Sequence, residues 1–424
     1  MKKNMQKSDS IFKKRIRRFK SIKRGYYSLI ILVTLYLISI FAPLIINKDA
    51  LIVCYANGTY DNDEKFEDIN NNGTYDSSEL FIDSYNYYFP ALNKMFGPIF
   101  GEKYYEASFF GQDSIKGIKR FGAPHYRLLK KKFEIENSGN YVIMPLYPFG
   151  PYEEVLSERN ETFKDSNNNG KYDQGESFED ENHNGELDQY NPATFPDNTN
   201  ILGTDNQGRD VFARLVYGLK VSLTFALVVT FFSYSIGIII GGTLGYFGGR
   251  VDLFGLRFIE IFSALPFLFL MMIFSQIFKP SIFLLAFMYM FISGWIGISW
   301  YVRGEFFREK AKDYVSAAVS MGQSTWKIII KHILPNALTP IITFAPFAVI
   351  GYISALVSLD FLGFGLQPPT PSWGELLVQG KGNLQYWHLI IVPLSAIGIT
   401  LFLITFIGEA IREAFDPKVH SRLR

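Results

Sequence analysis

Reactive and metal-binding side chains are scarce in this sequence. Its 424 residues include one cysteine, Cys54, and five histidines. A single cysteine cannot form an intrachain disulfide, and the histidines show none of the spacings of a zinc site. The nucleotide-binding pattern GxxxxGK[ST] and the hydrolase patterns HExxH and GxSxG are also missing. The sequence therefore predicts a protein that is not an enzyme and that hydrolyses no nucleotide itself.

Charged residues make up only 19% of the chain, and the net charge of +2 hides a division by sign. Between residues 48 and 200 there are 27 acidic and 14 basic residues, whereas the remainder carries 13 acidic and 28 basic ones. Parts of opposite sign are typical of a protein that faces two compartments or two kinds of partner. The basic residues lie beside apolar segments and not on an aromatic platform, which argues against nucleic-acid binding.

Long apolar runs, in contrast, are abundant. A helix needs about 20 apolar residues to cross the hydrocarbon core of a bilayer. Six stretches reach this length, so the sequence predicts an all-α polytopic membrane protein with six transmembrane helices and a large mixed insertion between the first and second. The stretches are residues 26–46, 221–246, 256–278, 282–301, 338–357 and 389–407.

The distribution of basic residues predicts the orientation of the spans. Residues 1–25 should be cytoplasmic, because eleven of the first 24 residues are Lys or Arg and one is acidic. Six crossings return the loop 302–337 and the tail 411–424 to the same side, and both are basic. The region 48–200 is then extracytoplasmic, between a first helix at 26–47 and the remaining spans within 201–410. The lipid bilayer is the first expected partner.

The basic segment 11–24, IFKKRIRRFKSIKR, has two interpretations. Its apolar residues fall roughly along one helical face, which suits a helix lying on anionic lipid. A disordered basic tail would satisfy the same charge rule, and both interpretations stay open.

Residues 316–336, SAAVSMGQSTWKIIIKHILPN, are predicted to form a polar hairpin of two short helices. Gly322 ends the first helix, and Pro335 ends the second because proline lacks an N–H and clashes with the preceding turn. Either Trp326 or residues 328–330 would supply an apolar surface. A hairpin of this kind fits a groove on a soluble partner. A connector exposed to solvent is the alternative, since Gly and Pro would end its helices in the same way.

Several further motifs follow one another in a fixed order. They are GYYSL at the first span, LGTDNQGRDVFARLVYG (202–218), GYFGGRVDLFGLRFIEIFSALP (245–266), SLDFLGFG (358–365), PSWGELLVQGKGNLQ (371–385) and FIGEAIREAFDP (406–417). Together they resemble the peptide-importer branch of the ABC permeases, in particular its oligopeptide and microcin C-type inner-membrane subunit. The resemblance covers most of residues 25–56 and 200–417.

The resemblance implies the type I ABC importer permease fold in the inner (cytoplasmic) membrane of a bacterium. It identifies the hairpin as the EAA loop, which docks on the ATPase. Ser316 stands where the broader family often has Glu, so a salt bridge from that position is in doubt. The coupling residues carried over are Ser316, Ala317, Ala318, Gly322, His332, Leu334, Pro335 and Asn336. His332 has a second interpretation, a structural hydrogen bond to a helix carbonyl.

By the same resemblance, the chain forms half of a translocation path for peptides or peptide-like compounds, beside a second permease subunit. Two ABC ATPase subunits, or one fused ATPase, would hydrolyse the ATP, and an extracytoplasmic substrate-binding protein would deliver the cargo. The permease itself would need no cofactor. Nickel or another small solute stays open as an alternative cargo.

The acidic region contains an internal repeat, since residues 60–68 recur 112 positions later as residues 172–180. Loops of the EF-hand form D-x-[DN]-x-[DN]-G-x5-E surround the repeat. In such a loop, positions 1, 3 and 5 supply side-chain oxygens, position 7 a carbonyl and position 12 a bidentate carboxylate, a set that suits Ca²⁺. Two loops are complete, and a third has Asn191 at the twelfth place. The candidate ligands are Asp68, Asn70, Asn72, Thr74, Asp76 and Glu79; Asp165, Asn167, Asn169, Lys171, Asp173 and Glu176; and Asp180, Asn182, Asn184, Glu186 and Asp188.

These loops make a membrane-anchored calcium sensor or surface structural protein the competing function. Six spans and the cytoplasmic hairpin disfavour it, because a sensor needs only one anchor. An Asn/Asp-rich disordered segment is the other interpretation of the repeats. The aromatic stretch 84–150 suits either a small soluble core or a surface on which a peptide docks.

Overall fold

The structure is a computed structural model that describes residues 11–56, 65–66, 81–82, 85–97, 125–136, 139–155, 163–164, 166, 172, 176–178, 187 and 191–415. The chain divides into two compact units. One, the helical unit, takes residues 1–39 and 215–424, and the other, the mixed unit, takes residues 40–214.

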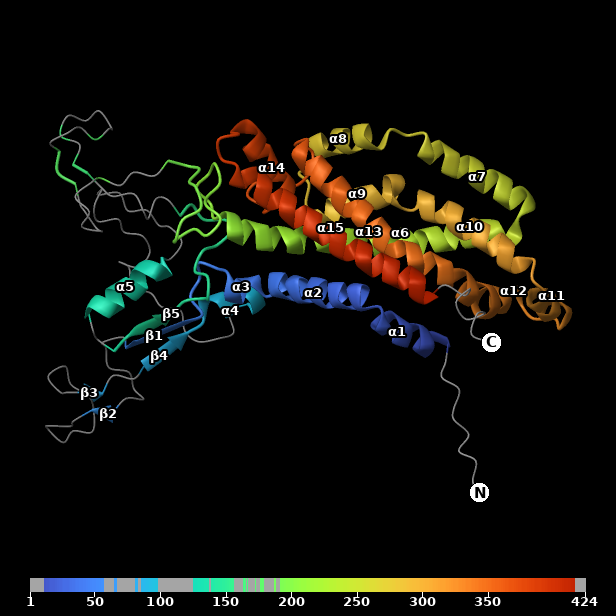
Figure 1. Ribbon diagram of the computed structural model, residues 1–424, viewed down its shortest axis with the longest axis horizontal. Coiled ribbons are helices and arrows are strands. Elements are labelled where there is room, and N and C mark those ends of the chain that lie inside the picture. Colours follow the sequence, from blue (N-terminus) through green and yellow to red (C-terminus); the bar gives the residue numbers. More distant parts are fainter. Residues whose placement is uncertain are drawn as a thin grey trace, which may run out of the picture. The chain divides into compact units, whose positions relative to one another are not determined.

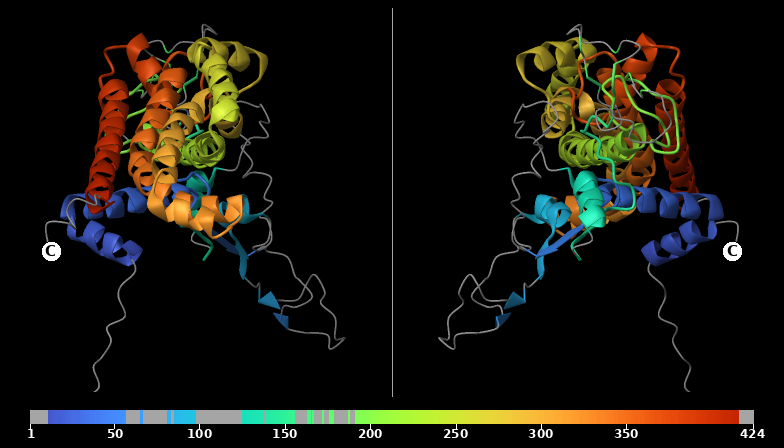
Figure 2. Two further views of the ribbon diagram at one scale, coloured as in Figure 1. Left: turned by 90° about the vertical axis from the view of Figure 1, so that its right-hand side faces the viewer. Right: turned by 90° about the vertical axis from the view of Figure 1, so that its left-hand side faces the viewer.

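The helical unit consists of long apolar helices with shorter helices between them (Figure 1). Its helices are α1 (Ile11–Ser21), α2 (Lys23–Ile40), α6 (Val211–Phe247), α7 (Gly249–Ser263), α8 (Phe267–Ile277), α9 (Ile282–Tyr289), α10 (Ile296–Lys310), α11 (Asp313–Ser320), α12 (Thr325–Ile328), α13 (Leu334–Phe361), α14 (Trp373–Gly382) and α15 (His388–Phe415). Two π-helical segments, η3 (Met290–Gly294) and η4 (Ile329–Ile333), join α9 to α10 and α12 to α13. Helices α13 and α15 lie side by side (Figures 1 and 2).

Within the described part of the chain, four helical runs are long and apolar enough to cross a membrane: α2, α6, Thr325–Phe361 and α15. Two bent pairs qualify only when each is taken together, α7 with α8 at 65° and α9–η3 with α10 at 48°. Six spans therefore result only if each bent pair crosses as one unit. The first bend falls at Pro266, which caps α8 and interrupts the backbone hydrogen bonding there.

The predicted helix end at Pro335 is wrong. Helicity continues from Thr325 to Phe361, and Pro335 lies in the first turn of α13. A proline loses little there, because the N–H groups of a first turn have no partner within the helix. The preceding π turn, in which the Leu334 N–H bonds to the Ile329 carbonyl, also widens the backbone ahead of the proline ring. The second arm of the hairpin is consequently continuous with the fifth apolar span.

Helices α6 and α10 approach until their backbones nearly touch. Glycines recur every fourth residue on α6, at Gly237, Gly241 and Gly245. A β-carbon at Gly237 would lie 1.9 Å from Ile298, and one at Gly241 would lie 2.3 Å from the carbonyl oxygen of Ser299. Small residues at this spacing allow close helix packing in lipid. The glycine stripe of α6 therefore sets the distance between these helices.

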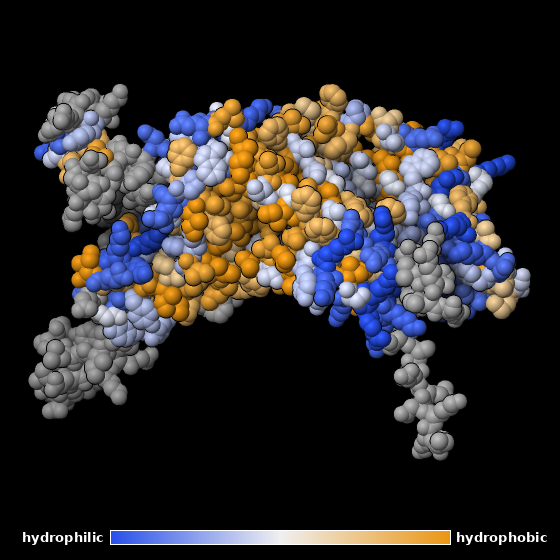
Figure 3. All heavy atoms as spheres, viewed as in Figure 1, coloured by the Kyte–Doolittle hydropathy of each residue, from blue (hydrophilic) through white to orange (hydrophobic). Residues whose placement is uncertain are grey.

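Apolar side chains cover the middle of the helical unit on the face seen in Figure 3, and hydrophilic residues gather at the end that carries α1. Several phenylalanines on this unit are between 66% and 70% exposed. Such an apolar belt next to a polar end is typical of a protein surrounded by lipid. The phenylalanines are Phe231, Phe254, Phe269, Phe283 and Phe402.

The mixed unit contains a three-stranded antiparallel sheet in the order β4-β1-β5. Val53 of the central strand lies opposite Tyr88 and Val142. Tyr126 and Phe133 of one helix pack on this sheet in a small core, so part of the aromatic stretch is core, the first of its two interpretations. The elements are α3 (Ala42–Ile45), β1 (Ile52–Ala56), β2 (Lys65–Phe66), β3 (Phe81–Ile82), β4 (Tyr85–Tyr88), α4 (Pro90–Phe96), α5 (Tyr126–Glu136) and β5 (Tyr141–Ile143), with β2 paired to β3.

A buried network of charges holds the motif LGTDNQGRDVF. The Asp205 carboxylate pairs with the guanidinium groups of Arg209 at 2.7 Å and Arg214 at 3.3 Å. The Asp210 carboxylate accepts a hydrogen bond from the Tyr147 hydroxyl at 2.6 Å. Burial raises the pKa of Asp210 above its ordinary value, and the hydrogen bond from Tyr147 opposes that rise. The motif thus has a structural role in the mixed unit, as buried charges require partners.

Candidate functional site

The predicted hairpin is formed by α11 and α12, at one end of the helical unit (Figure 1). Gly322 has a φ of +69°, in the left-handed region that glycine adopts without steric cost. Its N–H bonds to the Val319 carbonyl at 2.9 Å, and the Gln323 N–H bonds to the Ala318 carbonyl at 3.2 Å. This pair of bonds is a Schellman motif, which ends a helix. Gly322 therefore ends the first helix, as predicted.

One face of the hairpin packs against α10. Val315, Ala318 and Ile328 are at most 3% exposed and share a core with Val302 and Phe306. Ile328, one of the residues predicted for the apolar docking surface, is therefore part of the protein's own core. Val315 and Ile328, the larger two of these buried side chains, each stabilise the hairpin by about 1.5–3 kcal/mol. The hairpin is therefore a folded element of the protein.

Other apolar side chains of the hairpin are exposed. Trp326 is 71% exposed and Met321 is 70% exposed, while Val319 and Ile330 are each 56% exposed. Exposed apolar side chains gathered on one element mark an interaction surface. We call these four residues the hairpin tip. Trp326 and Ile330 come from the set that the sequence singled out, whereas Val319 and Met321 were not anticipated.

A hydrogen-bonded clamp joins the two arms at the base of the hairpin. The Tyr314 hydroxyl donates to the buried Glu309 carboxylate at 2.7 Å, and that carboxylate also pairs with Lys312 at 2.6 Å. The Asn336 amide donates to the Tyr314 oxygen at 3.2 Å and to the His332 carbonyl at 2.8 Å. Burial and the bond to Glu309 raise the pKa of Tyr314 to about 12. The hydroxyl therefore keeps its proton, and the clamp persists, throughout the physiological pH range.

Some of the eight coupling residues implied by the family resemblance belong to this clamp, and others lie on the surface. His332 lies with its Nε2 2.9 Å from the side-chain oxygen of Gln323, which ties the second arm to the turn. Glu309 and Tyr314 were missed by the sequence reasoning, because Glu309 is one of three acidic residues in the basic loop 302–337 and nothing local distinguishes it. Ser316, Ala317, Gly322, Pro335 and Asn336 are exposed, His332 and Leu334 are half-buried, and Ala318 is buried.

The candidate calcium ligands lie outside the described residues, except Glu176. The carboxylate of Glu176 accepts a hydrogen bond from the Ser166 N–H at 2.7 Å. Beside it, the Lys164 N–H bonds to the Ser177 carbonyl at 2.8 Å, and Phe163 bridges Phe178 in antiparallel fashion. The residues that flank the loop 165–176 are thus paired, with its twelfth residue folded over its second.

Two families of known proteins match the chain in sequence. The family of the binding-protein-dependent transport system inner membrane component matches residues 234–421, which include the hairpin. The N-terminal transmembrane domain of oligopeptide transport permease C matches residues 10–68.

Individual relatives extend these matches. The peptidoglycan transport system permease protein YejE of Agrobacterium fabrum is 34% identical over 406 residues, covering 96% of this chain and 93% of that protein. The inner membrane ABC transporter permease protein YejE of Escherichia coli is 47% identical over 223 residues, 52% of this chain and 65% of that protein. The oligopeptide transport system permease protein OppC of Haemophilus influenzae is 38% identical over 52% of this chain and 70% of that protein. Among solved structures, the inward-facing MetNI methionine ABC transporter aligns at 21% identity with a TM-score of 0.38, over 48% of this chain and 96% of that chain.

Proposed function

Because the chain belongs to the family of binding-protein-dependent transport system inner membrane components, we propose that it is the permease subunit of an ATP-driven importer for peptides and that α11 and α12 receive the force of the ATPase. The relatives' names refer to peptidoglycan and to oligopeptide transport, which favours a peptide or peptide fragment over nickel. The type I importer permease fold is the architecture that this function implies.

The observation that carries the coupling proposal is the continuity of the helix behind the hairpin tip. Residues Thr325–Phe361 form one helical run of 37 residues. At 1.5 Å per residue this run is about 55 Å long, enough to cross the whole bilayer. A displacement at Trp326 is therefore transmitted along one unbroken helical run, which continues through Pro340 and Pro346, into the spans that enclose the path. A flexible connector would dissipate that displacement.

The proposal includes the partners and the orientation. A second permease subunit completes the path, two ABC ATPase subunits or one fused ATPase bind the hairpin, and an extracytoplasmic binding protein delivers cargo. Both termini and the hairpin are cytoplasmic, and residues 48–200 are extracytoplasmic. In support, α1, the hairpin and the end of α15 lie at the same end of the helical unit (Figure 1), and six of the eleven residues of α1 are Lys or Arg.

Substitution of Gly322 tests the coupling role. Glu at this position introduces a charge beside Met321, inside the proposed ATPase groove. A buried charge without a partner costs about 3–5 kcal/mol, or more than a hundredfold in affinity. We expect the reconstituted Gly322→Glu complex to lose peptide uptake while the chain remains folded in the membrane.

Gly322→Asn is the matched control, because asparagine tolerates a positive φ and carries no charge. We expect its uptake to stay near that of the wild type. Wild-type uptake by a Gly322→Glu complex that is present in normal amount would contradict the coupling role.

A second proposal concerns calcium. The paired flanks of the loop 165–176, and the Glu176 carboxylate folded over Ser166, support a loop closed in the way that a bidentate ligand at position 12 requires. Bound Ca²⁺ would rigidify this part of the mixed unit. Because asparagines replace several aspartates, we expect an affinity at the weak, extracellular end of the range, about 0.1–1 mM.

Thermal unfolding of the full-length chain in detergent tests this proposal. Ca²⁺ at about ten times its dissociation constant should stabilise the mixed unit by about 1.4 kcal/mol, and Glu176→Gln should remove much of that gain. Glu134→Gln, an exposed acid on α5 of the same unit, is the control and should leave the gain intact. Equal responses of all three proteins, or no response at millimolar Ca²⁺, would exclude a site at this loop.

A further inference from the structure

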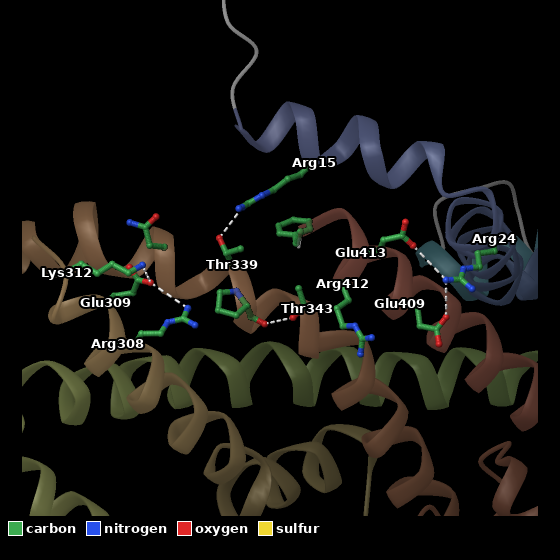
Figure 4. A pocket seen from close by; sticks show the side chains of 13 residues that line it. Arg15, Arg24, Arg308, Glu309, Lys312, Thr339, Thr343, Glu409, Arg412 and Glu413 are labelled. Carbon is green, nitrogen blue, oxygen red and sulfur yellow. Dashed lines mark hydrogen bonds and ion pairs between the residues drawn. The ribbon is translucent and has the colours of Figure 1, made fainter. Parts of the chain in front are cut away.

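A cavity of about 930 Å³ opens at the end of the helical unit that carries α1 (Figure 4). Its walls come from α1, α2, α10, α13 and α15 and from the start of the hairpin, so helices distant in sequence enclose it. Five positively charged and three negatively charged side chains line it. The lining cations are Arg15, Arg24, Arg308, Lys312 and Arg412, and the lining carboxylates are Glu309, Glu409 and Glu413.

Two of the cations form close ion pairs with carboxylates of the protein. Arg308 lies 2.5 Å from Glu305, and Lys312 lies 2.6 Å from Glu309. Lys312 donates a charge-assisted hydrogen bond to Glu309, and Arg308 forms a close ion pair with Glu305. These two residues do not supply the charge that a ligand would meet.

The other three cations are held loosely. Arg24 lies 3.6 Å from Glu409 and 3.9 Å from Glu413, beyond hydrogen-bond distance. Arg15 donates one hydrogen bond to the Thr339 hydroxyl at 3.1 Å, which leaves most of its five donors available.

Arg412 of α15 forms no ion pair with any side chain that the structure describes. In Figure 4, Arg15, Arg24 and Arg412 come from three different helices, with Arg15 extending toward Thr339 and Arg24 lying near Glu409 and Glu413. All three side chains line the same cavity, and guanidinium donors suit a phosphate because each matches two phosphate oxygens at once.

The surroundings of the cavity favour a lipid as the source of that phosphate. Phe415 and Pro340 give the cavity an apolar wall, and the Arg15 guanidinium lies 4.8 Å from the Phe415 ring centroid. Helix α1 carries further basic residues along an amphipathic face, and each basic residue near an anionic bilayer surface contributes about 1 kcal/mol. The cavity also lies where the long apolar helices α13 and α15 meet the polar end of the unit.

We propose that this cavity binds the headgroup phosphate of an anionic phospholipid through Arg15, Arg24 and Arg412. The proposal rests on the cytoplasmic orientation given above, which places these residues at the inner leaflet. Asn336 and Thr339 of α13 line the same cavity, next to the clamp of the hairpin. A lipid bound there joins α1 to the base of the helix that follows the hairpin tip.

The test uses the complete transporter, delipidated and then placed in nanodiscs of phosphatidylcholine with or without phosphatidylglycerol. Native mass spectrometry then counts the phosphatidylglycerol molecules that each complex retains. Arg24→Gln combined with Arg412→Gln removes two loosely held cations and should reduce retention at least about tenfold, since a hydrogen bond to a charged group contributes about 1.5–3 kcal/mol. Arg257→Gln is the matched control, because Arg257 is 72% exposed on α7 and outside the cavity.

Retention by the double variant equal to that of the wild type would overturn the proposal. Displacement of the lipid by millimolar inorganic phosphate would assign the cavity to a free anion instead. Loss of the ATPase from the double variant in pure phosphatidylcholine would make the cavity part of a protein interface. Gly322→Glu separates this proposal from the transport function: that variant should keep its phosphatidylglycerol while it loses uptake.

Discussion

A Trp326→Ala permease should lose most of its affinity for the ATPase subunit. Trp326 is 71% exposed on α12, as open as Met321 before the turn, and contributes little to the fold. Exposed tryptophans that fill a partner's pocket are typical binding hot spots, and their truncation costs about 2–4 kcal/mol. The dissociation constant should therefore rise roughly 30-fold to 1,000-fold. Titration of the purified ATPase against the permease pair in detergent measures this change.

Trp387→Ala controls for the loss of an exposed tryptophan as such. Trp387 is 52% exposed and precedes α15, whose other end lies near the hairpin (Figure 1). Its substitution should leave ATPase affinity unchanged. Equal affinities of the Trp326→Ala and wild-type permeases would remove the hairpin tip from the interface, whatever the effect on uptake.

Gly241→Leu should prevent the helical unit from folding correctly. A β-carbon at this position would lie 2.3 Å from the Ser299 carbonyl oxygen of α10 and 2.9 Å from the Val302 β-carbon. Backbone atoms cannot move aside as a flexible side chain can, so α6 and α10 would have to separate. Overpacking of this kind costs about 3 kcal/mol, a large part of the stability of most proteins. The thermal unfolding midpoint and the monodisperse yield in detergent should both fall steeply.

Gly351→Leu makes the same chemical change on α13, where a β-carbon meets no atom within 4 Å. It should leave the unfolding midpoint near its wild-type value, because leucine is a better helix former than glycine. A stable Gly241→Leu protein would show that the contact between α6 and α10 is not required for folding.

The hairpin shows where sequence reasoning reached the site and where it stopped. Gly322 was identified correctly, since the need for a left-handed residue after a helix is a local property of the backbone. The predicted helix end at Pro335 was wrong, because the π turn of η4 accommodates the proline within a continuing helix. No local sequence rule predicts that π turn. The same reasoning also grouped Ala317 with Ala318, although the first is exposed and the second is buried, and it left Trp326 and residues 328–330 as equal alternatives, although Trp326 is exposed and Ile328 is buried. Only the packing of α11 and α12 on α10 separates them.

The sequence by itself determined the composition of the membrane spans, the end of the first hairpin helix and the separation of charge, because each depends on the order of residues along the chain and on no contact between distant segments. The tertiary structure decided which apolar side chains form the hairpin tip, how the Glu309–Tyr314 clamp closes, and that three arginines from α1, α2 and α15 surround one cavity. The first two depend on how α11 and α12 pack on α10, and the third joins the two ends of the sequence. Their energies depend on distances that arise only when the helices have packed.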